Sequence, residues 1–306
     1  MRVGLVGTGY WARTVHGPSA ATHPRLTFSG VWGRDAAKAA EVARSLGGRG
    51  YTDFDEFLRD VDALTFAVPP DAQAELALRA ALSGKHVLLE KPIALSVGPA
   101  LELEQAVESA GVASIVFVTR RFTNDAAAWL DRIVEVGGWD CARAEFCAHI
   151  GGGPFEHSHW RLDKGALWDV GPHALSLVWP VMGAVASVIA GGGRGDQVHF
   201  VLRHTNGGSS TVSLSMTVPA PAIGNLVYVY GEAGRETLTY SPLDPRQIVA
   251  THQRALDALI DQVQHPARGH PCDVHFGARV VEVLAAAEQS LASQRAAQVA
   301  LVPARG

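Results

Sequence analysis

A glycine-rich turn directly after the first apolar segment constrains the fold of this 306-residue chain more than any other feature. Gly7 permits a tight turn, Gly9 lets a phosphate approach the backbone, and the small Ala12 lets a helix pack closely on the strand that precedes it. The N-terminus of that helix would face the phosphates. A turn that binds nothing is the alternative, but the strand before it and the helix after it favour a dinucleotide site. The predicted contact residues are Gly7, Thr8, Gly9, Tyr10, Trp11 and Ala12.

Up to residue 120, short β-branched segments alternate with alanine-rich segments, which indicates βαβ units and a parallel sheet. The expected strands are Arg2–Val6, Leu26–Trp32, Ala63–Val68, His86–Glu90 and Ser114–Thr119. The expected helices are Ala36–Leu46, Phe54–Arg59, Asp71–Ser83 and Val97–Ala110. Residues 1–120 are therefore predicted to form a doubly wound Rossmann domain.

Residues 121–306 have a different pattern, typical of an α+β domain on a mainly antiparallel sheet. The expected strands are Ala142–His149, Val185–Ala190, Gln197–His204, Ser210–Val218, Gly224–Tyr230 and Arg235–Tyr240. The expected helices are Thr123–Val136, Trp168–Met182, Thr251–Gln264 and Asp273–Arg295. We expect this domain to bind the substrate, and the exposed face of its sheet offers an interface for a homodimer or homotetramer.

Composition excludes several classes of protein. With 47% hydrophobic and 18% charged residues the chain can bury a large core, so it is expected to be globular. A net charge of −4 gives no basic surface for nucleic acid. The chain begins with a strand pattern rather than a signal peptide or membrane span, and its three cysteines form no CxxC pair. We therefore expect a cytoplasmic protein with a small-molecule substrate.

The residues that end the second expected strand bear on the choice of dinucleotide. An acidic residue there would hydrogen-bond the ribose 2′-hydroxyl of NAD, whereas an arginine accommodates the 2′-phosphate of NADP. Here Gly33 removes the acid and Arg34 supplies the donors, while Asp35 suits the N-cap of the next helix. The sequence favours NADP(H) and leaves NAD(H) possible.

The segment Glu90-Lys91-Pro92 ends a buried strand with charged side chains. Ligands of parallel sheets lie beyond the carboxyl ends of the strands, so Lys91 would point toward the nicotinamide. Pro92 fixes the turn, and a cis peptide bond before it is one way to do so.

Together with Gly7–Ala12 and Val68-Pro69-Pro70, this segment resembles the Gfo/Idh/MocA family of sugar and cyclitol oxidoreductases. Trp160-Arg161 and the segment 165–173 extend the resemblance into the second half. It implies an active site lined by Lys91, Asp169 and His173, with Pro69, Glu90 and Lys91 near the cofactor.

The spacing and chemistry of these residues suit such roles. If a helix begins near Trp168, Asp169 and His173 lie four residues apart on one face. His173 suits general acid/base chemistry near neutral pH, Lys91 would hydrogen-bond the reacting oxygen, and Asp169 would orient the substrate or the histidine. The structural alternatives are a surface salt bridge for Lys91, a helix cap for Asp169 and a core histidine for His173.

Some positions depart from the family pattern. Many relatives have a threonine and a histidine where this chain has Val68 and Gln73, and an asparagine or tyrosine near Thr119–Arg121. We name Trp160, Arg161 and Arg121 as candidate substrate contacts. His157 and His159 alternate as metal ligands do, but no further ligand completes the set, so no metal is predicted.

The predicted function is NADP(H)-dependent hydride transfer to or from a sugar, cyclitol or related polyol or ketone. A redox-neutral glycosidase that uses bound NAD is an alternative within the same fold. A non-catalytic cofactor sensor is another, although such a protein would be expected to lose the lysine and the histidine.

Overall fold

The computed structural model describes residues 1–239 and 243–300, which divide into two compact units. The first unit contains Met1–Phe122 and Leu243–Ala278. The second contains the described residues of 123–242 and 279–306. No helix in the described residues is both long and apolar enough to cross a membrane.

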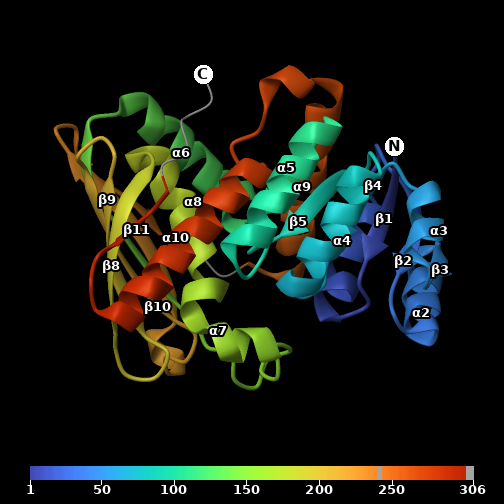
Figure 1. The fold of residues 1–306 in the computed structure, drawn as a ribbon, viewed down its shortest axis with the longest axis horizontal. Coiled ribbons are helices and arrows are strands. Elements are labelled where there is room, and N and C mark those ends of the chain that lie inside the picture. Colours follow the sequence, from blue (N-terminus) through green and yellow to red (C-terminus); the bar gives the residue numbers. More distant parts are fainter. Residues whose placement is uncertain (240–242, 301–306) are drawn as a thin grey trace. The chain divides into compact units, whose positions relative to one another are not determined.

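A parallel sheet forms the centre of the first unit (Figure 1). In the described residues it has six strands in the order β3-β2-β1-β4-β5-β6. These are β1 (Arg2–Val6), β2 (Thr27–Trp32), β3 (Arg49–Tyr51), β4 (Ala63–Phe66), β5 (His86–Glu90) and β6 (Ser114–Phe117). The predicted doubly wound fold is confirmed, with small differences at three strand ends. Only β3 was missed, because Arg-Gly-Tyr carries no apolar run.

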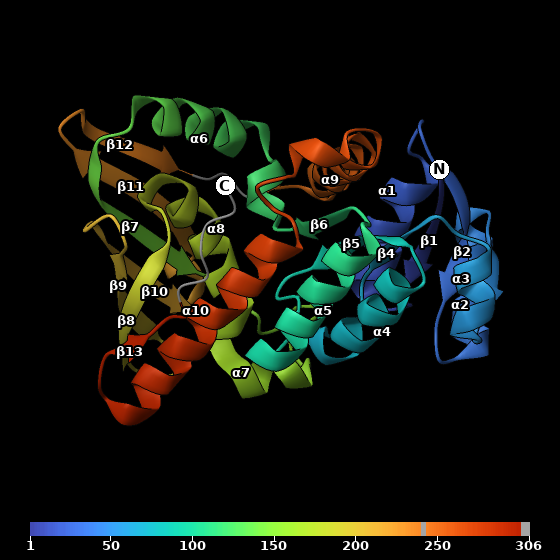
Figure 2. The same ribbon diagram turned by 45° about the horizontal axis from the view of Figure 1, so that its top comes forward.

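Helices of the first unit follow the strands as βαβ connections require. They are η1 (Ala12–His16), α1 (Gly17–Ala21), α2 (Ala36–Leu46), α3 (Phe54–Arg59), α4 (Pro70–Leu82), α5 (Val97–Ala110) and η2 (Thr119–Phe122). Figure 2 shows α4 and α5 side by side, and they pack against each other. Ala12 packs with Leu5 and Val31 in the core, which is the close helix–strand contact that its small side chain predicts.

The helix α9 (Pro245–Gln264) returns to the first unit after the chain has passed through the second. It packs against η1, α1 and β6, and Arg25 pairs with Asp257 and Asp261 on it. The short helix η4 (Pro266–Arg268) and the first residues of α10 (Val274–Ser293) also belong to this unit. The predicted domain boundary at residue 120 lies close to Phe122, where the first segment of the first unit ends. The predicted second domain also included Leu243–Ala278, whose contacts are with the first unit.

A second sheet forms the centre of the second unit. In the described residues it has seven strands in the order β12-β11-β7-β10-β9-β8-β13, and only the β7–β10 pair is parallel. They are β7 (Trp139–Cys147), β8 (Val185–Gly192), β9 (Val198–His204), β10 (Ser209–Ser215), β11 (Gly224–Gly231), β12 (Gly234–Thr239) and β13 (Ala297–Gln298). The mainly antiparallel prediction is confirmed. Tyr240, the predicted end of one strand, lies outside the described residues.

The helices of this unit are α6 (Asn124–Val136), α7 (His159–Asp169), α8 (Gly171–Met182), the short η3 (Ala220–Ala222) and the larger part of α10, from Arg279 onward. The prediction of one helix from Trp168 to Met182 was wrong, because α7 ends at Asp169 and α8 begins at Gly171. Pro172 has no backbone N–H to donate and lies in the first turn of α8, where that loss costs nothing. Asp169 and His173 therefore lie on two successive helices rather than on one face of one helix.

Candidate active site

The glycine turn after β1 has the geometry that a dinucleotide phosphate needs. Gly7 has φ +123°, and a Cβ there would collide with the carbonyl oxygen of Ala67. A Cβ at Gly9 would have no atom within 4 Å, so this side of the turn is open for a ligand. A dinucleotide therefore fits these residues. Tyr10 is 49% exposed beside the turn.

The residues after β2 keep their predicted arrangement. Arg34 is exposed, and Asp35 caps α2 by accepting a hydrogen bond of 3.1 Å from the backbone N–H of Lys38. The N-cap prediction for Asp35 is confirmed, so its carboxylate is bonded to the first turn of α2.

The Glu90–Pro92 turn is clamped by Gln73, one of the positions that depart from the family pattern. The bond between Lys91 and Pro92 is cis, as the sequence suggested. The fully buried Gln73 amide accepts from the Glu90 N–H at 2.7 Å and donates to the Glu90 carbonyl at 2.8 Å. The glutamine therefore supports the backbone of the turn from α4. Pro69 is the exposed N-cap residue of that helix.

The Glu90 side chain is held by three donors. Its Oε1 atom accepts from the Trp11 indole at 2.8 Å and lies 3.1 Å from Nε2 of His16, while Oε2 accepts from the Lys91 N–H at 3.2 Å. The indole N–H of Trp11 is thus directed at Glu90. A cofactor contact of Trp11 stays a prediction, as do those of Thr8 and Glu90.

In the second unit, Asp169 and Arg161 form a half-buried ion pair of 3.2 Å between Oδ2 and Nε. The guanidinium also donates to Ser158 Oγ at 3.1 Å, and its carbon lies 4.3 Å from the Phe155 ring centre and 4.5 Å from that of Trp160. The predicted Trp160-Arg161 pair is therefore one stacked unit that anchors Asp169.

This ion pair faces a cavity of about 200 Å³ within the second unit. Its lining is Ala148, His149, Ile150, Gly153, Pro154, Phe155, Arg161, Asp169 and Met216. The mixture of an apolar wall with a few polar groups is typical of a small-molecule site. Nδ1 of His149 lies 2.9 Å from the Val218 carbonyl oxygen. His149 was not predicted as a site residue, because it stands alone in the sequence.

His173 lies in the first turn of α8 and is half-buried. It belongs to the second unit with Asp169, whereas Lys91 belongs to the first.

Arg121 was predicted to contact the substrate, but its Nε donates to Sγ of Cys272 at 3.4 Å. Burial, together with the Arg121 charge, lowers the pKa of the neighbouring His270 to about 4. Burial also raises the pKa of the Cys272 thiol. Both groups are therefore neutral at physiological pH, and a substrate role for Arg121 stays a prediction.

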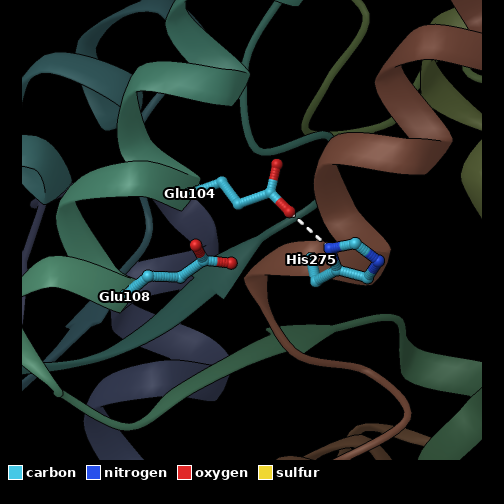
Figure 3. Close-up of side chains that lie close together, drawn as sticks. All are labelled: Glu104, Glu108 and His275. Carbon is cyan, nitrogen blue, oxygen red and sulfur yellow. Dashed lines mark hydrogen bonds and ion pairs between the residues drawn. The ribbon is translucent and has the colours of Figure 1, made fainter. Parts of the chain in front are cut away.

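One group of possible metal ligands lies among the described residues, and it does not include the exposed His157 and His159. It consists of Glu104 and Glu108 on α5 and His275 on α10 (Figure 3). Nδ1 of His275 forms an ion-pair contact with Glu104. Nδ1 of His275 is already bonded to the Glu104 carboxylate, and a metal ion would have to displace that bond, so we interpret the contact as a hydrogen-bonded pair.

Two family models match the chain. A model of the oxidoreductase family with an NAD-binding Rossmann fold, GFO_IDH_MocA, matches residues 1–118. A model of the GFO/IDH/MocA C-terminal domain matches residues 135–236. Together the two matches cover more than half of the chain.

Individual relatives are distant. Glucose-6-phosphate 3-dehydrogenase of Bacillus subtilis is 26% identical over 58% of this chain and 53% of its own length. Matches to the first curated relatives span 28% to 58% of the length of those proteins.

Solved structures share the fold along the whole chain. GenD2 from gentamicin A biosynthesis, in complex with NAD, has a TM-score of 0.87 at 22% identity, covering 98% of this chain and 97% of that one. Levoglucosan dehydrogenase, in complex with NADH and L-sorbose, has a TM-score of 0.84 at 19% identity, covering 99% of both chains.

Proposed function

Because the chain belongs to the Gfo/Idh/MocA family of oxidoreductases, we propose that it transfers hydride between a nicotinamide dinucleotide and a sugar, cyclitol or related polyol or ketone. The observation that carries this proposal is the position of Lys91. It follows β5 in the sheet whose β1 ends in the open glycine turn, and β4 alone separates the two strands. The sheet reverses its winding between β1 and β4, where ligands of open α/β sheets bind.

The bound nicotinamide would supply the hydride acceptor or donor. Lys91 would donate a hydrogen bond to the reacting oxygen and stabilise negative charge that develops there. His173 would take the hydroxyl proton in oxidation and return it in reduction. Asp169, kept in place by Arg161, would orient the substrate hydroxyl or the imidazole. Trp160 and Arg161 would then support the substrate site rather than contact the substrate directly.

The relatives support a carbohydrate-like substrate, since one is a glucose-6-phosphate 3-dehydrogenase and another holds L-sorbose. The test is a panel of polyols and keto-sugars, read as nicotinamide absorbance with both cofactors. Lys91→Ala and His173→Ala should each lower kcat about 10² to 10⁴-fold while the cofactor still binds. Lys85→Ala, at the opposite end of β5, is the matched control and should keep kcat near the wild-type value.

Full turnover in both variants would contradict the assignment. Retained cofactor and sugar cleavage without a net absorbance change would indicate a redox-neutral glycosidase instead.

For the cofactor we propose NADP(H) in preference to NAD(H). The exposed Arg34 follows β2, and Asp35 is occupied as an N-cap. Arg34→Ala should weaken NADPH binding about tenfold and leave NADH binding nearly unchanged, as measured by fluorescence titration. Equal changes for the two cofactors would refute the arginine argument.

We also propose that the protein acts in the cytosol as a homodimer or homotetramer. Ile189 and Val201 are paired neighbours on the second sheet and are 51% and 39% exposed. Tyr230 on β11 is also exposed, at 46%. Light scattering of the purified protein would measure the assembly, and Val201→Glu should dissociate it if this face is the interface.

A further inference from the structure

A cluster of buried polar side chains lies behind the Glu90–Pro92 turn and is not used by the proposed chemistry. Ser19, Thr65, His16 and His252 are each 0% exposed. They come from α1, β4, η1 and α9, so residues 236 positions apart in the sequence are in contact. Buried polar groups are costly unless each finds a hydrogen-bond partner, so such a cluster needs an explanation.

The distances join these side chains into one chain of hydrogen bonds that ends at Glu90. Ser19 Oγ lies 2.6 Å from Nδ1 of His252, and Nε2 of His252 lies 3.3 Å from Thr65 Oγ1. Thr65 Oγ1 lies 2.7 Å from Nδ1 of His16, and Nε2 of His16 lies 3.1 Å from Glu90 Oε1. Two side contacts accompany the chain: 3.1 Å between the two histidines and 3.0 Å from Ser19 Oγ to the His16 carbonyl.

The directions of the bonds follow if Glu90 is the final acceptor and both histidines are neutral rings. An ionised carboxylate only accepts, so His16 donates through Nε2 and, as a neutral ring, accepts at Nδ1. Thr65 then donates its hydroxyl hydrogen to Nδ1 of His16. Nε2–H of His252 lies 3.3 Å from Thr65 Oγ1 and 3.1 Å from Nδ1 of His16, so it donates to this pair of acceptors. Ser19 has one hydroxyl hydrogen and two acceptors nearby, Nδ1 of His252 at 2.6 Å and the His16 carbonyl oxygen at 3.0 Å, and this arrangement assigns the hydrogen to the nearer one. Full burial lowers the pKa of His252 well below its usual value, which fits the neutral ring that this arrangement requires.

We propose that Ser19, His252, Thr65 and His16 form a positioning relay for Lys91, in which four linked hydrogen bonds hold the Glu90 carboxylate in place. This inference rests on the proposed function for the role of Lys91. Aligned hydrogen bonds in a buried chain polarise and strengthen one another. With Oε1 held by His16 and Trp11, Oε2 remains on the Lys91 N–H. A loosened Glu90 carboxylate would instead be available to the Lys91 ammonium and would draw it from the substrate.

Thr65 gives the sharpest test, because Thr65→Val has nearly the same shape and removes only the hydroxyl that donates to Nδ1 of His16 at 2.7 Å. The 3.1 Å contact between the two histidines is then the remaining bond to that nitrogen. We expect kcat to fall about tenfold, with the cofactor Kd within about twofold of the wild-type value. Thr65→Ser restores the hydroxyl and should restore kcat. The matched control is His23→Gln, which removes a 96% buried histidine that pairs with Asp257 at 3.2 Å and lies outside the relay. It should leave kcat unchanged.

A second measurement reads the relay without any substrate. In the ¹⁵N spectrum of histidine-labelled protein, His16 and His252 should both be neutral rings with the proton on Nε2. Nδ1 of His16 should accept from Thr65, and Nδ1 of His252 should accept from Ser19. Each resonance is assigned by its loss in a His→Gln variant. Thr65→Val should shift the Nδ1 resonance of His16, whereas His23→Gln should not.

Either of two results would overturn the relay: a proton on Nδ1 of His16, or an unchanged kcat in a folded Thr65→Val protein. Failure of the proposed function looks different. In that case the wild-type protein would turn over no substrate of the panel, and the histidine spectrum would still decide whether the hydrogen-bond chain exists.

Discussion

The two units hold their candidate site residues by different physical means. In the first unit the backbone of the Glu90–Pro92 turn is fixed by the uncharged amide of Gln73, which is 0% exposed. In the second unit Asp169 is fixed by a charged partner, and the two side chains are 15% and 18% exposed. Uncharged buried hydrogen bonds are indifferent to salt but costly to delete, whereas an ion pair near solvent is screened and contributes less. The backbone at Lys91 should therefore be held more rigidly than the side chain of Asp169.

The largest effect on stability is expected from Gln73→Leu. The substitution leaves the buried N–H and C=O of Glu90 without their amide partner, which should lower the free energy of unfolding by about 3 kcal/mol. Urea titration would measure it. Gln105→Leu, on the exposed surface of α5, is the control and should change stability by less than about 0.5 kcal/mol. A loss below about 1 kcal/mol for Gln73→Leu would remove the contrast between the units.

Acid should weaken the first unit through its buried histidines. The folded pKa values of His252 and His270 lie below the value of about 6.5 expected in the unfolded chain, so protons bind more readily to the unfolded state. Their contribution is complete above about pH 6.5 and falls by about 1.4 kcal/mol per pH unit for each histidine between about pH 6.5 and 5.

Urea midpoints at several pH values would show this slope, and His270→Gln should reduce it. The exposed His157→Gln should leave it unchanged. A stability that is flat over this range in the wild-type protein would show that these histidines are not buried as described.

The smallest effect is expected in the second unit. Arg161→Lys keeps the charge but loses the planar fork that contacts Asp169 and stacks between Phe155 and Trp160. We expect a loss of about 1 kcal/mol in the free energy of unfolding. Added salt should reduce the difference between variant and wild type, which differential scanning calorimetry would measure. Arg132→Lys, in an exposed pair with Glu236, should cost less than about 0.5 kcal/mol. Equal losses at the two positions would mean that Arg161 gains nothing from its stacking.

Much of the first sheet could be predicted because its strands are continuous apolar runs between clear helix signals. β1 and β5 have their predicted bounds, and the glycine turn follows from spacing alone. The β3 strand could not be predicted, since three residues without an apolar run carry no signal. The break between α7 and α8 could not be predicted, because Gly165 (φ +66°) is typical of a loop and the apolar residues after it indicate a single helix. Pro172, which lies in the first turn of α8, did not by itself mark a second helix start.

The site was predicted only where its residues lie in motifs. Lys91, Asp169 and His173 stand in recognisable segments, but their supports do not. Gln73 departs from the family pattern, but that departure alone indicates no partner at Glu90. Nothing near His252 indicates a partner at Thr65 or His16. Such pairs depend on tertiary contacts between distant segments, and local sequence patterns do not indicate these contacts.

The return of α9 to the first unit also sets an order for synthesis on the ribosome. The strands β1 to β6 emerge first, yet His252 and the arginine partners Asp257 and Asp261 follow only after the whole segment 123–242 has been made. Until then Thr65 and His16 lack a neighbour that the finished protein gives them. Domains usually fold as they emerge, with the N-terminal one first. Here the N-terminal unit is complete only after Leu243–Ala278 has been made. A nascent chain that stalls before this segment would therefore expose a Rossmann unit without α9 to chaperones and proteases.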